Sequence, residues 1–319
     1  MNDYVFSARK VKGGQFSSEP GAVAYLQVPP NVTVPTPAHR ISLRSWSEEV
    51  RKAATWGKAT WKPDADRGDV LIFVHGYNVT QAEMLETHRK LHKNLRTAGY
   101  KGTLVSFDWP SVGKAINYLE DRHDAKHSAI QLVKGGIMPL AALQTTDCAI
   151  NVHLLGHSTG AFVIREAFDD ADDCNLPAGG FRISQVALIA GDISSGSTAE
   201  TREECKSLFR HAQRLTNYFN RHDAVLKLSN VKRAGVAPRI GRVGLAPDVD
   251  PKAVDIDCSD YFRATYPEAT VTSTPNCHSW HFGDMTFAED VFATLKGDED
   301  REAIGTRQLM NEVLTLRAN

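Results

Sequence analysis

Apolar residues along this chain gather in short runs without alternation, a pattern typical of parallel strands buried on both faces. Between the runs, apolar residues recur at three- and four-residue spacing, as in 81–95 and 161–168, which predicts helices. Strands that alternate with helices predict an α/β fold with a doubly wound, mostly parallel sheet. Ligands of such sheets bind beyond the carboxyl ends of the strands. The expected strands are 69–74, 102–107, 151–155, 183–190 and 214–219.

The first 67 residues precede this alternating pattern. We expect an N-terminal extension (1–67) made of two short strands at 4–7 and 23–28, a proline-rich crossing segment and one short helix within 45–60. Residues 68–319 are expected to form the main α/β domain.

Three further segments are expected to flank or cover the sheet. Residues 112–145 have a helical pattern with a break at Gly135-Gly136, and helices are also expected at 286–295 and 301–316. Residues 229–275 are rich in Gly, Pro, Asp and Arg, which predicts a long excursion with little regular structure. Because loops of this length are uncommon unless they serve a function, we expect this segment to be a partial lid.

Composition and charge exclude several classes of protein. The chain has 37 Lys and Arg against 38 Asp and Glu, and no long basic run, so nothing points to nucleic acid as a partner. No apolar stretch reaches the length of a membrane span, and the first residues lack the pattern of a signal peptide. The five cysteines are odd in number and form no Cys-x-x-Cys pair. Free thiols, a reducing compartment and hence the cytoplasm are expected.

The predicted strand at 151–155 leads into Gly156-His157-Ser158-Thr159-Gly160, the pattern Gly-x-Ser-x-Gly, and a predicted helix follows. Between a strand and a helix, this pattern is a nucleophile elbow, in which a tight turn pushes the serine out above the sheet. The flanking glycines are needed because a Cβ atom there would clash. Ser158 is therefore the candidate nucleophile.

A serine hydroxyl needs a histidine to take its proton and a carboxylate to orient the imidazole. In this topology the chain order is Ser, then Asp or Glu, then His. Asp223 follows the strand at 214–219 and is the first candidate for the acid, with Asp192 as the alternative. Of twelve histidines only His278 and His281 lie beyond Asp223, so the base is one of these two.

An oxyanion hole needs two backbone N–H groups. Thr159, directly after the nucleophile, is expected to supply one, and Tyr77, in the loop after His75-Gly76, the other. Asn78 is expected either to join them or to hold that loop in shape. Trp109 follows another strand, where it lines the pocket or packs beneath it. No spaced set of His, Cys and carboxylate ligands appears at the strand ends, so no metal and no cofactor are expected.

With these motifs the chain resembles an α/β-hydrolase, and more narrowly a bacterial α/β-hydrolase family of unknown function. The resemblance implies the fold and a triad of Ser158, Asp223 and His278, and no particular substrate. It favours His278 over His281, because the family requires histidine in the pattern His278-Ser279-Trp280. The segments that carry it are 73–78, 107–111, Tyr118 with Asp121, 155–160, 220–223 and 278–280.

The sequence therefore predicts a cofactor-independent serine hydrolase that acts on small-molecule carboxylic esters through an acyl-enzyme. Acyl transfer or thioester cleavage is the alternative within enzymes. A non-catalytic binding protein on a hydrolase scaffold is the alternative outside them. The sequence indicates no oligomeric state.

Overall fold

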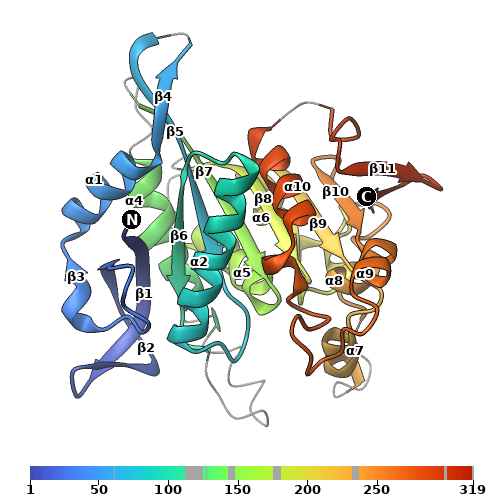
Figure 1. The fold of residues 1–319 in the computed structure, drawn as a ribbon, viewed down its shortest axis with the longest axis horizontal. Coiled ribbons are helices and arrows are strands. Elements are labelled where there is room, and N and C mark those ends of the chain that lie inside the picture. The colour runs from blue at the N-terminus through green and yellow to red at the C-terminus, as the bar shows by residue number, and fades with distance from the viewer. Residues whose placement is uncertain are drawn as a thin grey trace.

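The three-dimensional structure is a computed structural model that describes residues 1–60, 62–111, 125–126, 128–142, 148–174, 181–231, 237–297 and 300–317. Within these residues the strands form one sheet in the order β11-β12-β10-β9-β8-β7-β5-β6-β1-β2-β3, with β4 paired to β5 (Figure 1). The strands are β1 (Asp3–Lys12), β2 (Gln15–Val28), β3 (Arg40–Ile41), β4 (Thr55–Ala59), β5 (Lys62–Val74), β6 (Thr103–Asp108), β7 (Cys148–His157), β8 (Ile183–Ile189), β9 (Ala212–Phe219), β10 (Ala253–Asp257), β11 (Arg307–Met310) and β12 (Val313–Leu316).

The sheet is parallel from β1 through β6, β5, β7, β8, β9 and β10 to β12. Antiparallel pairing between the described strands occurs in the hairpins β1–β2 and β4–β5, in β2–β3 and in β11–β12. This arrangement confirms the predicted doubly wound, mostly parallel sheet with an N-terminal hairpin.

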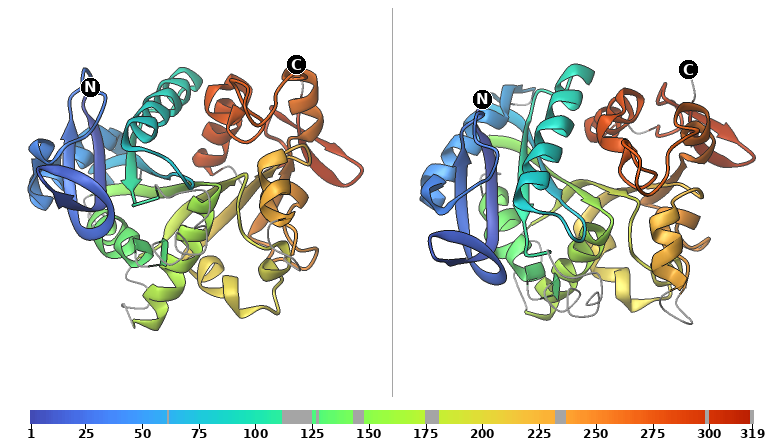
Figure 2. Two further views of the ribbon diagram at one scale, coloured as in Figure 1. Left: turned by 90° about the horizontal axis from the view of Figure 1, so that it is seen from below. Right: turned by 60° about the horizontal axis from the view of Figure 1, so that its bottom comes forward.

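Helices cover both faces of the sheet. Figure 2 shows it nearly edge-on, with α2 and α10 on one side and α4 and α5 on the other. The α-helices are α1 (Leu43–Ala54), α2 (Gln81–Ala98), α4 (Met138–Ala141), α5 (Thr159–Asp173), α6 (Lys206–His211), α7 (Ala224–Val231), α8 (Ile240–Val243), α9 (Ser259–Thr265) and α10 (Met285–Lys296). A π-helical turn (Leu132–Ile137) and short 3₁₀ turns (Pro37–His39, Ser195–Thr198, Glu203–Cys205 and Trp280–Gly283) complete the regular structure.

The apolar run in β5 explains this layering. Val70, Ile72 and Val74 pack in the cluster beneath α1 and α5, and Leu71 and Phe73 pack in the cluster beneath α2 and α10. Successive strand side chains point to opposite faces, so a strand covered on both sides must be apolar at every position.

The N-terminal residues extend the sheet on one side. β1 pairs in parallel with β6, with Tyr4 opposite Val105, and antiparallel with β2. The division that we expected between residues 67 and 68 falls within β5, and both parts contribute strands to the same sheet. The two termini lie at opposite ends of the sheet (Figure 1).

The prediction of little regular structure in 229–275 is wrong for part of that segment. β10 pairs with β9 inside the sheet, and α9 follows directly. Asp255 and Asp257 gave β10 a loop-like composition, but each carboxylate has a partner from elsewhere in the chain. Asn217 Nδ2 donates to Asp255 at 2.7 Å, and an Arg221 guanidinium nitrogen donates to Asp257 at 2.8 Å.

The tail contains one confirmed helix and one wrong prediction. The helix expected at 286–295 is α10, and Asp284 caps its first turn by accepting a hydrogen bond from Phe287 N at 2.7 Å. The helix expected at 301–316 is instead the hairpin β11–β12. Asn311 and Glu312 at its turn have φ of 50° and 65°, the left-handed conformation that tight hairpins require.

Much of 112–145 lies outside the described residues, including Tyr118 and Asp121. The described positions 128–141 are helical, in agreement with the prediction, and Gly135-Gly136 fall within the π-helical turn. In the described chain, no helix has the length and apolarity needed to cross a membrane.

Candidate active site

Ser158 occupies the turn between β7 and α5 in a strained conformation. Its φ of 54° and ψ of −122° are rare for a residue with a side chain, and such strain costs about 1–3 kcal/mol. Hydrogen bonds hold the turn: Ser158 N donates to Ile189 O at 2.9 Å, and Ser158 O accepts from Asp192 N at 3.0 Å. The next strand and its following loop therefore fix the serine backbone.

The two glycines around Ser158 allow the strand and helix to approach closely. A Cβ atom on Gly160 would lie 2.1 Å from Val74 O, and one on Gly156 would lie 2.7 Å from the Ile164 side chain. Any larger residue at position 160 would push α5 away from β5.

Asp223 and His278 lie at hydrogen-bond distance although 55 positions separate them. His278 Nδ1 is 2.6 Å from Asp223 Oδ2, and Asp223 is buried. The other oxygen of Asp223 accepts from Leu226 N at 3.0 Å at the start of α7. Burial lowers the pKa of His278, but the Asp223 carboxylate, with a smaller contribution from Asp192, raises it to a net value above 6.5.

The backbone of His278 is fixed from two sides. Asn276 Oδ1 accepts hydrogen bonds from His278 N at 2.9 Å and from Ser279 N at 2.8 Å. His157 Nε2 lies 3.0 Å from His278 O, where it donates as the neutral tautomer. Burial, reinforced by His278, lowers the pKa of His157 to about 3, so this ring stays neutral. The residue before Ser158 thus ties the His278 loop to the serine turn.

Asp192, the alternative acid, has a different main partner. Its Oδ1 lies 3.0 Å from Arg239 Nε, and both side chains are 3% exposed. Asp192 still lies close enough to His278 to raise the pKa of that imidazole. Arg239 was not anticipated, because it comes from the segment 47 positions further along the chain that we expected to be irregular.

His281, the alternative base, is enclosed by aromatic side chains. Its ring stacks on Trp280 at 4.0 Å between centroids and meets Phe287 edge-on at 5.0 Å. Burial, with His157 and His278 nearby, holds the pKa of His281 well below 6.5. Neither ring nitrogen has a hydrogen-bond partner among the described residues. His281 is therefore placed for packing, and His278 is the histidine that meets a carboxylate.

The loop after β5 runs directly beside Ser158. A Cβ atom on Gly76 would lie 3.0 Å from the Ser158 Cβ, so this backbone passes against the candidate nucleophile. Tyr77 follows at a half-buried position, and Thr159 is the buried first residue of α5. Asn78 has φ of 53°, and its N–H donates to Ser111 O at 2.7 Å. This hydrogen bond stabilises the conformation of the loop.

A buried ionic network lies beneath this loop. Asp108, at the end of β6, accepts from Ser7 Oγ at 2.7 Å, Arg9 Nε at 2.7 Å and Gln81 Nε2 at 2.8 Å. Burial raises the pKa of Asp108, but Arg9 and His75 lower it to a net value of about 2.

Three contacts of Trp109 extend this network to the loop after β5. Trp109 is fully buried, donates from Nε1 to His75 O at 2.9 Å and stacks on the His75 ring. Arg9 donates to Trp109 O at 2.9 Å. Trp109 therefore packs beneath the loop, and the N-terminal strand β1 helps to position it.

Comparison with protein families matches residues 52–270 to the family described as alpha/beta hydrolase of unknown function (DUF900). The match spans more than half of the chain. The chain belongs to this family. The predicted resemblance and the α/β-hydrolase fold are thereby confirmed. The matched range ends before His278 and begins after Arg9, so these two residues of the DUF900 hydrolase are placed by the structure alone.

Several solved structures are similar to this DUF900 hydrolase. A Pyrobaculum calidifontis esterase is 11% identical with a TM-score of 0.38, covering 81% of this chain and 93% of its own. A structure from a study of two fungal esterases from Rhizomucor miehei is 11% identical with a TM-score of 0.41. The match covers 93% of this chain and 83% of the fungal chain. A hormone-sensitive lipase from a metagenome library is 12% identical with a TM-score of 0.38. The match covers 76% of this chain and 80% of the lipase chain. Comparison with curated proteins gave no match. The family match carries the assignment.

Possible metal ligands are scattered in the described part of this DUF900 hydrolase. No group of three or more His, Cys, Asp or Glu side chains there is arranged to hold a metal ion. The chemistry available at the strand ends is a serine, an imidazole paired with a carboxylate, and backbone N–H groups.

Proposed function

We propose that this DUF900 hydrolase is a serine esterase that cleaves small-molecule carboxylic esters through an acyl-enzyme. Ser158 is the nucleophile, His278 the general base and Asp223 the carboxylate that orients it. The observation that carries the proposal is the 2.6 Å contact between His278 Nδ1 and Asp223, on a loop held by the residue that precedes Ser158.

The tautomer follows from this contact. Because Nδ1–H donates to Asp223, the lone pair of neutral His278 is on Nε2, where it can accept a proton. Ser158 Oγ attacks the acyl carbon as its proton moves to Nε2, and the carbonyl oxygen becomes an oxyanion. Asp223 then stabilises the imidazolium.

The backbone N–H groups of Tyr77 and Thr159 are proposed to hold the oxyanion. Support comes from Gly76, whose backbone lies against Ser158, and from Thr159 at the first turn of α5, where N–H groups lack partners within the helix. Collapse of the tetrahedral intermediate breaks the ester C–O bond, and His278 gives its proton to the leaving alcohol. Water, deprotonated by His278, then releases the acid and restores Ser158.

A fluorophosphonate probe and a burst assay test this proposal. We expect the probe to label the native chain at Ser158, and heat denaturation to abolish labelling, because an unfolded serine is not activated. We expect p-nitrophenyl esters of graded chain length to give an initial burst of p-nitrophenol. Ser158→Ala should remove both signals. Native protein that neither labels nor hydrolyses any ester of the series would contradict the proposal and favour a binding protein.

Acyl transfer and thioester cleavage use the same acyl-enzyme and differ in the acceptor or the leaving group. Adding alcohols or thiols during turnover distinguishes transfer from hydrolysis, because a true acceptor diverts the acyl group from water.

We also propose a reducing compartment, the cytoplasm, for this protein. Among the described residues Cys174, Cys205, Cys258 and Cys277 are free thiols, and burial raises the pKa of Cys205 to about 11, which keeps it unreactive. Locating a fluorescent fusion in cells of the source species would test this.

A further inference from the structure

A pocket of about 300 Å³ lies beside Asp223 among α7, α8 and α9. These three helices lie close together on the β9–β10 side of the sheet (Figure 1). The pocket borders the proposed triad, because Asp223 forms part of its wall and also contacts His278. The proposed ester cleavage leaves the pocket's other side chains unused.

Basic side chains dominate the wall of this pocket: Arg221, Lys227, Arg242 and Arg263. Arg221 already pairs with Asp257 at 2.8 Å. Lys227, Arg242 and Arg263 form no ion pair with the described residues, and Arg242 Nε is buried without a hydrogen-bond partner there. A buried, unsatisfied guanidinium N–H is costly unless a ligand accepts from it.

The histidine of this pocket is influenced by neighbouring charges of both signs. The pKa of His222, which also lines the pocket, is lowered first by burial and then by Arg263 and Arg221, against the opposite effects of Asp260 and Asp257. Asp223, the carboxylate in the wall of the pocket, already accepts hydrogen bonds from Leu226 N at the start of α7 and from His278 Nδ1.

We propose that this pocket binds the phosphate group of a small molecule, held by Lys227, Arg242 and Arg263. A phosphate dianion fits this set better than a carboxylate. Lys227, Arg242 and Arg263 form no ion pair among the described residues, and three positive charges less the Asp223 carboxylate leave a formal charge of about +2. Guanidinium groups also match phosphate oxygens with paired N–H donors. Phe262 and Pro267 provide an apolar wall for the part of the ligand that carries the phosphate.

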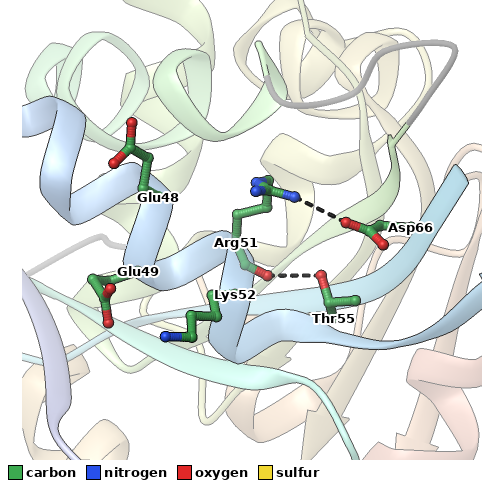
Figure 3. A pocket seen from close by; sticks show the side chains of 6 residues that line it. All are labelled: Glu48, Glu49, Arg51, Lys52, Thr55 and Asp66. Atoms are coloured by element: carbon green, nitrogen blue, oxygen red, sulfur yellow. Dashed lines mark hydrogen bonds and ion pairs between the residues drawn. The ribbon is translucent and has the colours of Figure 1, made fainter.

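The pocket beside α1 provides a matched control. It has a volume of about 410 Å³ and contains one arginine and one lysine, Arg51 and Lys52. Figure 3 shows that carboxylates of Glu48, Glu49 and Asp66 accompany them, and Arg51 donates to Asp66 at 2.9 Å. This pocket has no excess of positive charge, so we expect it not to bind phosphate.

Isothermal titration calorimetry with inorganic phosphate and with phenyl phosphate, at low ionic strength, tests the proposal without any turnover. We expect saturable binding to the wild type, weakened by about tenfold or more in Lys227→Gln/Arg242→Gln. Arg51→Gln/Lys52→Gln removes the same two charges elsewhere and should bind as the wild type does. Raising the salt concentration should weaken binding, because both partners are charged and partly exposed.

The choice of ligand distinguishes a phosphate monoester from free phosphate. Tighter binding of phenyl phosphate assigns the pocket to a monoester, and equal binding assigns it to inorganic phosphate. Sodium acetate that binds as tightly as phosphate, no saturable binding of either phosphate, or equal losses in the two double variants would overturn the proposal. Should Lys227→Gln/Arg242→Gln fail to fold by circular dichroism, the exposed single change Lys227→Gln gives the same comparison against Lys52→Gln.

Discussion

Replacing Arg9 by methionine should destabilise the protein strongly, although Arg9 lies far from Ser158 in sequence. Arg9 Nε lies 2.7 Å from Asp108 Oδ1, and the two side chains are 3% and 0% exposed. In Arg9→Met the Asp108 carboxylate stays buried and loses its principal cation. Removing one partner of a buried pair costs about 3–5 kcal/mol.

The lowered pKa of Asp108 makes this contribution to stability depend on pH. Burial raises this pKa, but Arg9 and His75 bring it from 3.8 down to about 2. This net displacement corresponds to about 2–3 kcal/mol for all the surroundings of Asp108 together, and the share of Arg9 is larger because burial opposes it. A carboxylate with a lowered pKa contributes this stability above its unfolded pKa and loses it as the pH falls through the folded value. The unfolded pKa of Asp108 is the same in both proteins and cancels from their difference. The loss in Arg9→Met should therefore vanish as the pH falls towards about 2 and be fully present only above the folded pKa in the variant, which burial raises.

Urea unfolding followed by circular dichroism at several pH values measures this effect. Arg44→Met is the control, because Arg44 pairs with Glu48 at the surface with 89% of its side chain exposed, and such pairs contribute about 0–1 kcal/mol. Arg9→Met/Asp108→Asn should recover part of the loss, because the buried charge is gone. If the free energy of unfolding of Arg9→Met at neutral pH lies within about 0.5 kcal/mol of the wild-type value, the Arg9–Asp108 pair contributes no more than a surface ion pair, and the reasoning is refuted.

Four further predictions concern the proposed site. Asp223→Asn should lower kcat for p-nitrophenyl ester hydrolysis by about 10³–10⁴-fold, because the imidazole is no longer held in the correct tautomer and the imidazolium loses its counter-charge. Asp192→Asn should lower kcat much less, and a larger loss in Asp192→Asn than in Asp223→Asn would make Asp192 the acid. His278→Ala should abolish the acyl-enzyme burst, and His281→Ala should keep it; stopped-flow traces with the opposite outcome would make His281 the base. Ester hydrolysis should fall as the pH drops through a value above 6.5, since the raised pKa of His278 governs its basic form, and in Asp192→Asn that midpoint should move down. Activity should survive EDTA, since the proposed steps use a serine hydroxyl, an imidazole, a carboxylate and backbone N–H groups; loss that a divalent ion restores would show otherwise.

Sequence patterns were sufficient to predict the elements whose physical cause lies in neighbouring residues. The run Val70–Val74 in β5 is apolar at every position because helices cover both its faces, and this pattern can be recognised within five residues. The turn at Ser158 follows from two glycines at fixed spacing. The chain order of a triad then reduced twelve histidines to two candidates, one of which meets Asp223 in the structure.

Non-local contacts were not predictable in this way. Arg9 is an ordinary polar residue in its own strand, and its pairing with Asp108 depends on β1 lying beside β6. β10 has a polar composition because Asn217 and Arg221, on or just after β9, satisfy its carboxylates. The β11–β12 hairpin turns at Asn311-Glu312, without the glycine that marks such turns most clearly. Each of these errors involves a partner or a turn that periodicity alone does not encode.

The place of β1 in the sheet also sets the timing of folding during synthesis. β1 and β2 are adjacent in sequence, and a hairpin of this kind closes in about 1–10 μs. The other edge of β1 pairs with β6, where Tyr4 lies opposite Val105. β6 begins about 100 residues after β1. At a ribosomal rate of about 5–20 residues per second, this edge of β1 therefore stays unpaired for about 5–20 s until β6 is synthesised. An open strand edge is a template for pairing with other chains, so the interval before β6 emerges is when the nascent chain most needs protection.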